Sequence, residues 1–376
     1  MDLVLHPSGS DSALSSNYRR AFAQATTLFV VSAYLTEWNK SLKLGPNCDK
    51  FRIIVGKDFG VTRKSACVDV LKWLPNSRKG EFLVADGIAG FHPKAIFWRE
   101  ASNRAFAIVG SSNLTRAAFS TNHEANGYCE INSNAFDAVE QWIARIESSC
   151  VPVSEDWLAR YHEARPSPGR STGPRARVQP TIGFPLPRPA GMVKLINRRR
   201  RQLTVYAKQR NGLLSLFRQC AEGEISNADF YQRLPSFWSS EIGDRLQGAG
   251  WERKGANSNF RTLSKSFLRI VEATSSDRDD VVIREIDRLG KKGVPSRKAF
   301  LSEMLCLRFP SEYPVLNYPI VQYLRAMKFR APRSATEGVK YIDLAKKLRF
   351  SLRENPDHPA KNIAELDTVI WKKYGK

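Results

Sequence analysis

The stretch GFHPKAIFWREASNRAFAIVGSSNLTRAAFSTNHEANGYCEI, residues 90–131, decides both the fold and the chemistry expected of this chain. Two short apolar runs within it predict buried strands. His92 and Lys94 are two residues apart, so on an extended strand both side chains leave the same face. The second apolar run ends at Gly110-Ser111-Ser112-Asn113, where we expect a helix to begin with its free N–H groups pointing outward. Together these features predict a phosphate site.

Outward from this stretch, roughly the first 150 residues mix apolar runs with amphipathic segments. This alternation predicts an α/β sandwich. The expected strands are residues 3–5, 27–35, 52–55, 82–84, 95–97 and 105–109, and the expected helices are residues 10–24, 63–74 and 135–146.

The second half of the chain has a different character. Residues 165–192 are rich in proline, glycine and arginine, which predicts a linker between a first domain (1–164) and a second domain (193–376). The second domain is expected to be mainly α-helical, because apolar residues recur there at helical spacing. The expected helices are residues 212–221, 228–234, 260–273, 281–289, 298–307, 320–327 and 339–352.

The composition favours a polyanionic partner. The chain has 376 residues, a net charge of +22 and an isoelectric point near 9.9. Nucleic acid is the first candidate, because each neutralised phosphate releases condensed counterions, and an anionic membrane surface is the second. A basic protein without a particular polyanionic partner stays open as the third interpretation.

Other patterns exclude several classes of protein. The six cysteines include no C-x-x-C pair, so no zinc-binding spacing is present and a secreted disulfide scaffold is not expected. No apolar run approaches the roughly 20 residues that cross a bilayer, and no secretory leader is recognisable. We therefore expect a cytoplasmic protein without a membrane segment.

Considered by chemistry alone, His92 is a candidate nucleophile, metal ligand or core histidine. It is the only one of five histidines with a lysine two positions on and small and amide residues downstream. A metal site is disfavoured, because no second histidine, cysteine or aspartate lies at ligand spacing around it. Neither a metal nor a cofactor is expected.

Three short motifs together resemble the phospholipase D superfamily: His92-Pro93-Lys94, Gly110-Ser111-Ser112-Asn113 and Asn122-His123-Glu124. The resemblance covers roughly residues 1–150 and implies a phospholipase D-like mixed-sheet sandwich. The superfamily often has an aspartate five positions after the lysine, where this chain has Arg99.

The resemblance implies a metal-independent mechanism. His92 would attack phosphorus and form a phosphohistidine, while a second histidine protonates the leaving oxygen and then activates water. Lys94 and Asn113 would hold the phosphoryl oxygens. Glu124 would accept a hydrogen bond from the other imidazole nitrogen and fix its tautomer.

Two residues near this set have alternative roles. Ser111 either donates to the phosphate or caps the following helix. Glu130 competes with Glu124 for the acidic role, and Glu124 is preferred because its Asn-x-Glu setting resembles that of the superfamily more closely.

The chain carries a single copy of the motif, whereas the mechanism requires two histidines. We therefore expect a homodimer in which both motifs meet at a two-fold interface. A single-motif domain joined to a second domain resembles the metal-independent restriction endonucleases, which implies a DNA-cutting enzyme of a host-defence system. A phospholipid hydrolase or transferase, and a non-catalytic nucleic-acid-binding protein, are the alternatives.

The second domain would then bind DNA. Arg198 and Arg199, within the basic run 197–201, are candidate phosphate contacts, with a solvated helix face as the alternative. Lys291 and Lys292 lie in a Gly-Lys-Lys-Gly turn that we expect to precede a helix, a faint resemblance to the helical hairpins of DNA-repair proteins. The recognition domain of such restriction enzymes is often a β-barrel, which this helical pattern does not match.

Overall fold

A computed structural model describes residues 1–6, 13–164, 183–248 and 252–375. The chain divides into two compact units, Met1–Ile182 with Arg330–Ala335 and Gly183–Phe329 with Thr336–Lys376. Most of the expected linker, residues 165–182, lies outside the described residues.

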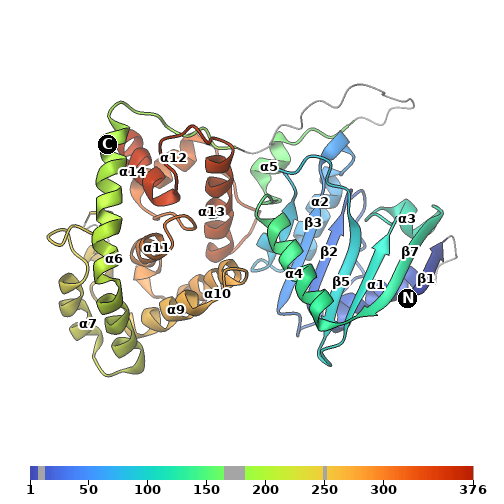
Figure 1. Cartoon of the computed structure of the whole chain (residues 1–376), viewed down its shortest axis with the longest axis horizontal. Helices are drawn as coiled ribbons and strands as arrows, with labels where there is room; N and C mark the ends of the chain where they lie inside the picture. The colour runs from blue at the N-terminus through green and yellow to red at the C-terminus, as the bar shows by residue number, and fades with distance from the viewer. Residues whose placement is uncertain (7–12, 165–182, 249–251, 376) are drawn as a thin grey trace. The chain divides into compact units, whose positions relative to one another are not determined.

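The first unit is built on one eight-stranded sheet with the order β1-β7-β6-β5-β2-β3-β4-β8 (Figure 1). Strands β2, β3 and β4 pair in parallel and all other neighbours pair antiparallel, so the sheet is mixed. The strands are β1 (Asp2–His6), β2 (Ala25–Ser32), β3 (Lys50–Val55), β4 (Phe82–Val84), β5 (Lys94–Glu100), β6 (Ala105–Gly110), β7 (Glu124–Ile131) and β8 (Val151–Pro152). The α/β prediction for this half is confirmed, and all six expected strands are present.

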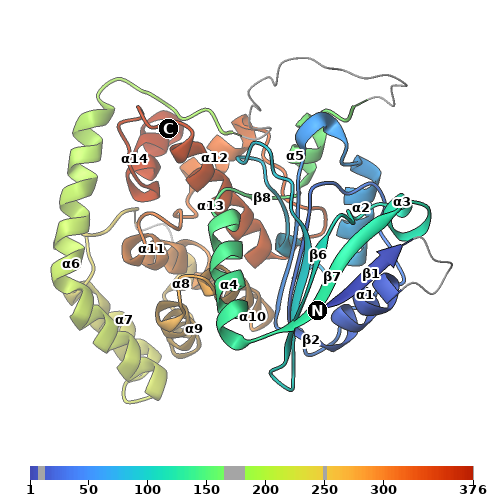
Figure 2. The ribbon, with the colours of Figure 1, turned by 45° about the vertical axis from the view of Figure 1, so that its right-hand side comes forward.

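Helices cover both faces of the sheet. Figure 2 shows α4 (Ser133–Glu147) on one side and α1 (Ala13–Gln24) with α2 (Lys64–Trp73) on the other. Phe29 and Val31 of β2 pack in one cluster with Phe136 of α4. The residues between them face the opposite side, because side chains alternate along a strand. This two-sided burial explains why the sequence of β2 is an almost continuous apolar run.

All elements described in the second unit are helical, as the pattern of apolar residues predicts. They are α6 (Met192–Glu222), α7 (Asn227–Arg233), α8 (Glu252–Gly255), α9 (Phe260–Glu272), α10 (Arg278–Lys291), α11 (Ala299–Arg308), α12 (Tyr318–Ala326), α13 (Glu337–Arg353) and α14 (Ile363–Tyr374), with short 3₁₀ turns between some of them. Within the described ranges, no helix combines the length and apolarity that crossing a membrane requires.

Besides the short helix α8, which was not predicted, two longer helices of this unit differ from the predictions. Helix α6 begins at Met192, about 20 residues before the expected start at 212, and contains the whole arginine run. Its buried residues Ile196 and Tyr206 lie between charged ones, which hides the helical period in the sequence. Helix α14 was not predicted, although its Leu366 belongs to the core cluster that includes Ile196.

We expect Phe136→Ala to lower the free energy of unfolding by about 3–5 kcal/mol, because it opens a cavity between α4 and the sheet. Urea denaturation would measure the change. Phe59→Ala is the matched control, because it makes the same deletion on a side chain that is 69% exposed, and it should change stability by less than about 0.5 kcal/mol. Equal losses in the two variants would contradict this account of the core.

Candidate functional site

The polar residues of the stretch 90–131 come together where strands β5, β6 and β7 begin or end, and we call this end of the three strands the site edge of the sheet. Lys94 opens β5 opposite Ser32, the last residue of β2. Gly110 ends β6 opposite Asn126, near the start of β7. Because β5, β6 and β7 pair antiparallel, the start of β5, the end of β6 and the start of β7 lie side by side. The residues gathered there are His92, Lys94, Ser111, Asn113 and Glu124.

Gly110 allows β6 and β7 to approach closely at this edge. A Cβ atom at this position would collide with the carbonyl oxygen of Ala125 and with Oδ1 of Asn126. A glycine is therefore required where the strand passes into the Ser111-Ser112-Asn113 loop.

His92 and Lys94 form the reactive pair of the edge. The ammonium nitrogen Nζ of Lys94 lies 2.9 Å from Nδ1 of His92 and also donates to the His92 carbonyl oxygen at 3.3 Å. The ring of Tyr34 meets the imidazole edge-on, with 5.8 Å between the ring centroids. His92 is exposed, whereas Lys94 is half-buried. An exposed imidazole with a cation beside it can receive a phosphodiester.

The environment of Lys94 changes its acidity. Burial lowers the pKa of Lys94, and the negative charge of Glu124 opposes that shift without cancelling it. The ammonium therefore loses its proton at a lower pH than an ordinary lysine, and Glu124 helps to keep it charged.

The carboxylate of Glu124 has a different set of partners from the one predicted. Glu124 is only 8% exposed. One oxygen accepts a short hydrogen bond from the Ser111 hydroxyl, and the other accepts from Nδ2 of Asn122 at 3.1 Å. The bond to a second imidazole, which the resemblance implies, stays a prediction. In this chain Glu124 acts on Lys94 through its charge and on the loop through Ser111.

Ser111 does not cap the following helix, which was one of its two predicted roles, and its contact with a phosphate stays a prediction. Its hydroxyl donates to Glu124 and accepts from the backbone N–H of Ala125 at 3.0 Å, so it ties the loop to β7. The helix cap is Thr115 instead, whose side chain accepts from the N–H of Ala118.

The prediction that a helix begins at Gly110-Ser111-Ser112-Asn113 is wrong. Helix α3 (Arg116–Ser120) starts farther on and has only five residues. Three of the loop N–H groups, those of Ser111, Ser112 and Leu114, also donate within the protein rather than to an anion. The N–H of Ser111 donates to the Ala125 carbonyl, and the N–H of Ser112 donates to Oδ1 of Asn126. The N–H of Leu114 donates to Oγ of Ser32, and all three distances lie between 3.0 and 3.3 Å.

Asn113 is held with its amide donor available. Its Oδ1 accepts from the backbone N–H of Tyr34 at 3.2 Å and from the Ser32 hydroxyl at 3.4 Å. No described residue accepts a hydrogen bond from its Nδ2. Because both contacts engage the oxygen, the NH₂ group is free to bind a phosphoryl oxygen, as predicted for this residue.

The sequence analysis missed Asp58, which supports the turn before His92. Asp58 is 6% exposed, and its Oδ2 accepts from the backbone N–H of Gly90 at 2.7 Å. Gly90 has a φ of 72°, a conformation that favours glycine. Oδ1 of Asp58 has no hydrogen-bond partner among the described residues. Burial raises the pKa of Tyr34, and the negative charge of Asp58 adds to that shift. The only feature of the sequence that could have pointed to Asp58 is its place shortly after the buried strand β3.

Two other residues considered from the sequence lie in ion pairs away from this cluster. Arg99 pairs with Asp137 at 3.2 Å and its guanidinium lies over the Phe136 ring. Glu130 pairs with Arg104 at 2.6 Å. Both residues therefore take part in ion pairs within the protein. Of the two glutamates considered, Glu124 is the one that lies near His92 and Lys94.

The four basic residues predicted to bind DNA lie in the second unit. Arg199 is 3% exposed and pairs with Asp367 at 3.1 Å, so we correct its assignment from a phosphate contact to a buried structural ion pair. Arg198, on the same helix α6, is exposed. Lys291 and Lys292 are exposed too, and they lie at the end of α10, before the short turn Pro295–Arg297 and helix α11.

Comparisons with known proteins leave the family of this chain open. Models of known protein families give no match to it, and neither do curated protein sequences. Among the described residues, no group of three or more histidine, cysteine, aspartate and glutamate side chains is arranged to hold a metal ion.

We expect Glu124→Gln to lower the pKa of Lys94 further, because the substitution removes the negative charge that opposes the effect of burial. An NMR titration of ¹³C-methylated lysines would measure it, with Lys94→Arg identifying the signal. Glu130→Gln, which neutralises an exposed carboxylate, is the control and should leave the signal unchanged. An unchanged Lys94 titration in Glu124→Gln would contradict the electrostatic link.

Proposed function

We propose that this protein is a metal-independent phosphodiesterase with a phospholipase D-like catalytic unit, and that it cuts DNA. The observation that supports this most is the meeting of an imidazole, an ammonium and an amide donor at one sheet edge, contributed by His92, Lys94 and Asn113. A nucleophile next to two donors for phosphoryl oxygens suits phosphoryl transfer.

In the proposed reaction, a ring nitrogen of His92 attacks phosphorus and the bond to the leaving oxygen breaks. A second imidazole gives that oxygen its proton. Water then attacks the phosphohistidine, the same imidazole takes the proton of the water, and His92 is released. Lys94 and Asn113 neutralise the charge that builds on the phosphoryl oxygens. Glu124 keeps Lys94 protonated for this role.

A second copy of the chain would supply the second imidazole. An exposed apolar patch lies on the face of the sheet opposite to the Lys94 and Glu124 side chains, where Leu3 and Leu5 of the edge strand β1 are 69% and 66% exposed. Val109, which is 53% exposed, continues this face directly before Gly110. Exposed apolar side chains on neighbouring strands are typical of a protein interface. We propose that two copies meet along this side of the sheet and that the strand ends carrying His92 then face one phosphodiester together.

The net charge supports a nucleic-acid substrate, since +22 favours a polyanion over a single headgroup. Exposed Arg198, Lys291 and Lys292 are the proposed backbone contacts of the helical unit. A role in restriction or host defence and a cytoplasmic location belong to the same proposal. All six cysteines are free thiols, which suits a reducing compartment.

We expect His92→Ala to abolish cleavage of DNA in EDTA, because the phosphohistidine cannot form. A gel assay of cut products would measure this, with phosphatidylcholine hydrolysis as the test of the alternative substrate class. His123→Ala is the matched control, because His123 is an exposed imidazole next to Glu124. Cleavage that persists in His92→Ala would overturn the assignment. Loss of cleavage in His123→Ala would place the second imidazole in the same chain.

We expect Leu3→Asp to convert a dimer into monomers and to abolish cleavage, because a buried carboxylate without a partner opposes association. Light scattering and the cleavage assay would measure the two effects. Val193→Asp makes the same kind of change at an exposed site on α6 and should alter neither. A wild-type monomer with full activity would contradict the dimer.

A further inference from the structure

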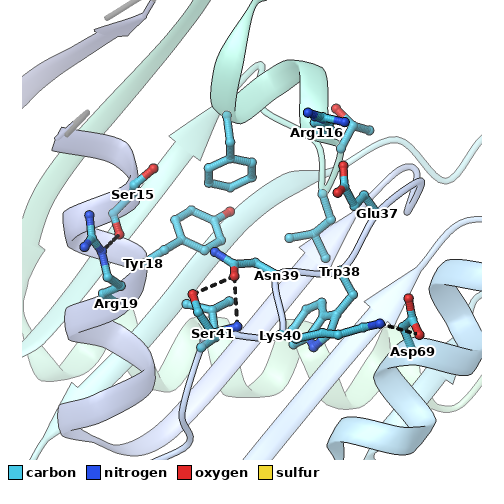
Figure 3. A pocket seen from close by; sticks show the side chains of 14 residues that line it. Ser15, Tyr18, Arg19, Glu37, Trp38, Asn39, Lys40, Ser41, Asp69 and Arg116 are labelled. Carbon is cyan, nitrogen blue, oxygen red and sulfur yellow. Dashed lines mark hydrogen bonds and ion pairs between the residues drawn. The ribbon is translucent and has the colours of Figure 1, made fainter. Parts of the chain in front are cut away.

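A pocket beside the candidate site has no part in the chemistry proposed so far. Its volume is about 720 Å³, within the range of about 300–1,000 Å³ that is typical of small-molecule sites. It lies between α1, the loop that follows β2, α2 and the start of α3, all within the first unit (Figure 3). Leu114, the residue after Asn113, lines it, and the Leu114 carbonyl accepts from the N–H of Thr36 at 3.0 Å. The pocket and the phosphate site therefore share a wall.

Aromatic rings form much of the lining. Tyr18 of α1 and Phe119 of α3 meet edge-on, with 5.0 Å between their ring centroids. Trp38 lines the pocket from the loop after β2. Flat rings of this kind are the side chains on which nucleobases stack.

Hydrogen-bond donors without partners accompany the rings. Oδ1 of Asn39 accepts from the backbone N–H and from the hydroxyl of Ser41, at 3.0 and 2.7 Å. These contacts engage the amide oxygen, and no described residue accepts from the NH₂ group. Nε1 of Trp38 is buried and is also without a partner in the described part of the chain. A ligand with ring nitrogens or carbonyl oxygens would satisfy the Asn39 donor, whereas the buried Trp38 nitrogen is out of its reach.

The charges at the pocket are mixed, which separates it from a simple anion site. Lys40 pairs with Asp69 at 3.0 Å. Arg19 and Arg116 are exposed, and Figure 3 places Glu37 close to Arg116. A phosphate alone would meet carboxylates here, whereas a neutral aromatic base would not be repelled and its sugar-phosphate chain could follow the exposed arginines.

We propose that this pocket binds a nucleobase of the same strand whose phosphodiester reaches His92. The inference rests on the proposed phosphodiesterase activity and names its substrate class. A base that is stacked and paired in a duplex cannot enter a pocket, so the strand must be single or locally unpaired there. The preferred substrate is therefore single-stranded nucleic acid.

Binding of labelled oligonucleotides to the full-length His92→Ala protein tests the proposal without cleavage. We expect a single-stranded oligonucleotide to bind at least about tenfold more tightly than the same strand with abasic residues, measured by fluorescence anisotropy at fixed salt. The corresponding duplex should also bind more weakly than the single strand. Equal affinity for the parent and abasic strands would overturn the pocket assignment.

Pocket variants locate the effect. Phe119→Leu removes an aromatic face, and Asn39→Asp keeps the oxygen that accepts from Ser41 but removes the amide donor. Each should weaken binding of the parent strand about tenfold and bring it close to the abasic strand. Asn47→Asp, the same charge change on an exposed loop residue that does not line the pocket, is the control. The proposal would be overturned if Phe119→Leu and Asn39→Asp bound the parent strand as tightly as the control Asn47→Asp does.

Cleavage by the wild-type protein separates this inference from the proposed function. If the base preference is present but no phosphodiester is cut, the pocket stands and the enzyme assignment fails. If parent and abasic strands are both cut and bound equally well, the enzyme assignment stands and the pocket fails.

Discussion

The candidate site depends on the antiparallel register of β5, β6 and β7. Ala95 pairs with Val109, and Gly110 pairs with Asn126. A slip of one residue in either pairing would move alternate side chains to the opposite face of the sheet. The Lys94 side chain would then point away from the loop that carries Asn113. The Glu124 side chain would point away from both Lys94 and that loop. The register is fixed by burial, because the apolar residues of these strands have to face the core beneath α4 and α1.

Electrostatics at this edge comes from side chains rather than from backbone dipoles. The N–H groups of Ser111, Ser112 and Leu114 donate within the protein, and α3 is short and capped by Thr115. The positive charge available to a phosphate is therefore that of Lys94, whose pKa burial lowers and Glu124 raises. A buried carboxylate held by Ser111 and Asn122 gives the site a fixed negative charge near the Lys94 ammonium. Glu124 therefore has two effects: it holds the loop through Ser111, and it helps to keep Lys94 charged.

Two surfaces of the first unit adjoin this edge and give it its proposed context. The exposed apolar residues of β1 and β6 offer a place for a second chain, which would complete a site that has one histidine of the two required. The aromatic pocket behind Leu114 offers a place for a base. Both features depend on residues that are unremarkable in the sequence, since Leu3 and Phe119 look like ordinary core residues until the structure leaves one exposed and the other beside a cavity.

The sequence by itself determined six of the eight strands of the sheet, the helical character of the second unit and the pairing of His92 with Lys94, because these follow from apolar periods and short spacings. It gave no signal for β7 and β8. It missed most of α6, whose buried residues lie between charged ones, and it placed a helix start at a loop whose N–H groups bond to β7. Tertiary structure alone decided that Asp58 supports the turn at Gly90 and that Arg199 is buried against Asp367. Such contacts join residues 32 and 168 positions apart, at distances in the chain where local patterns carry no signal.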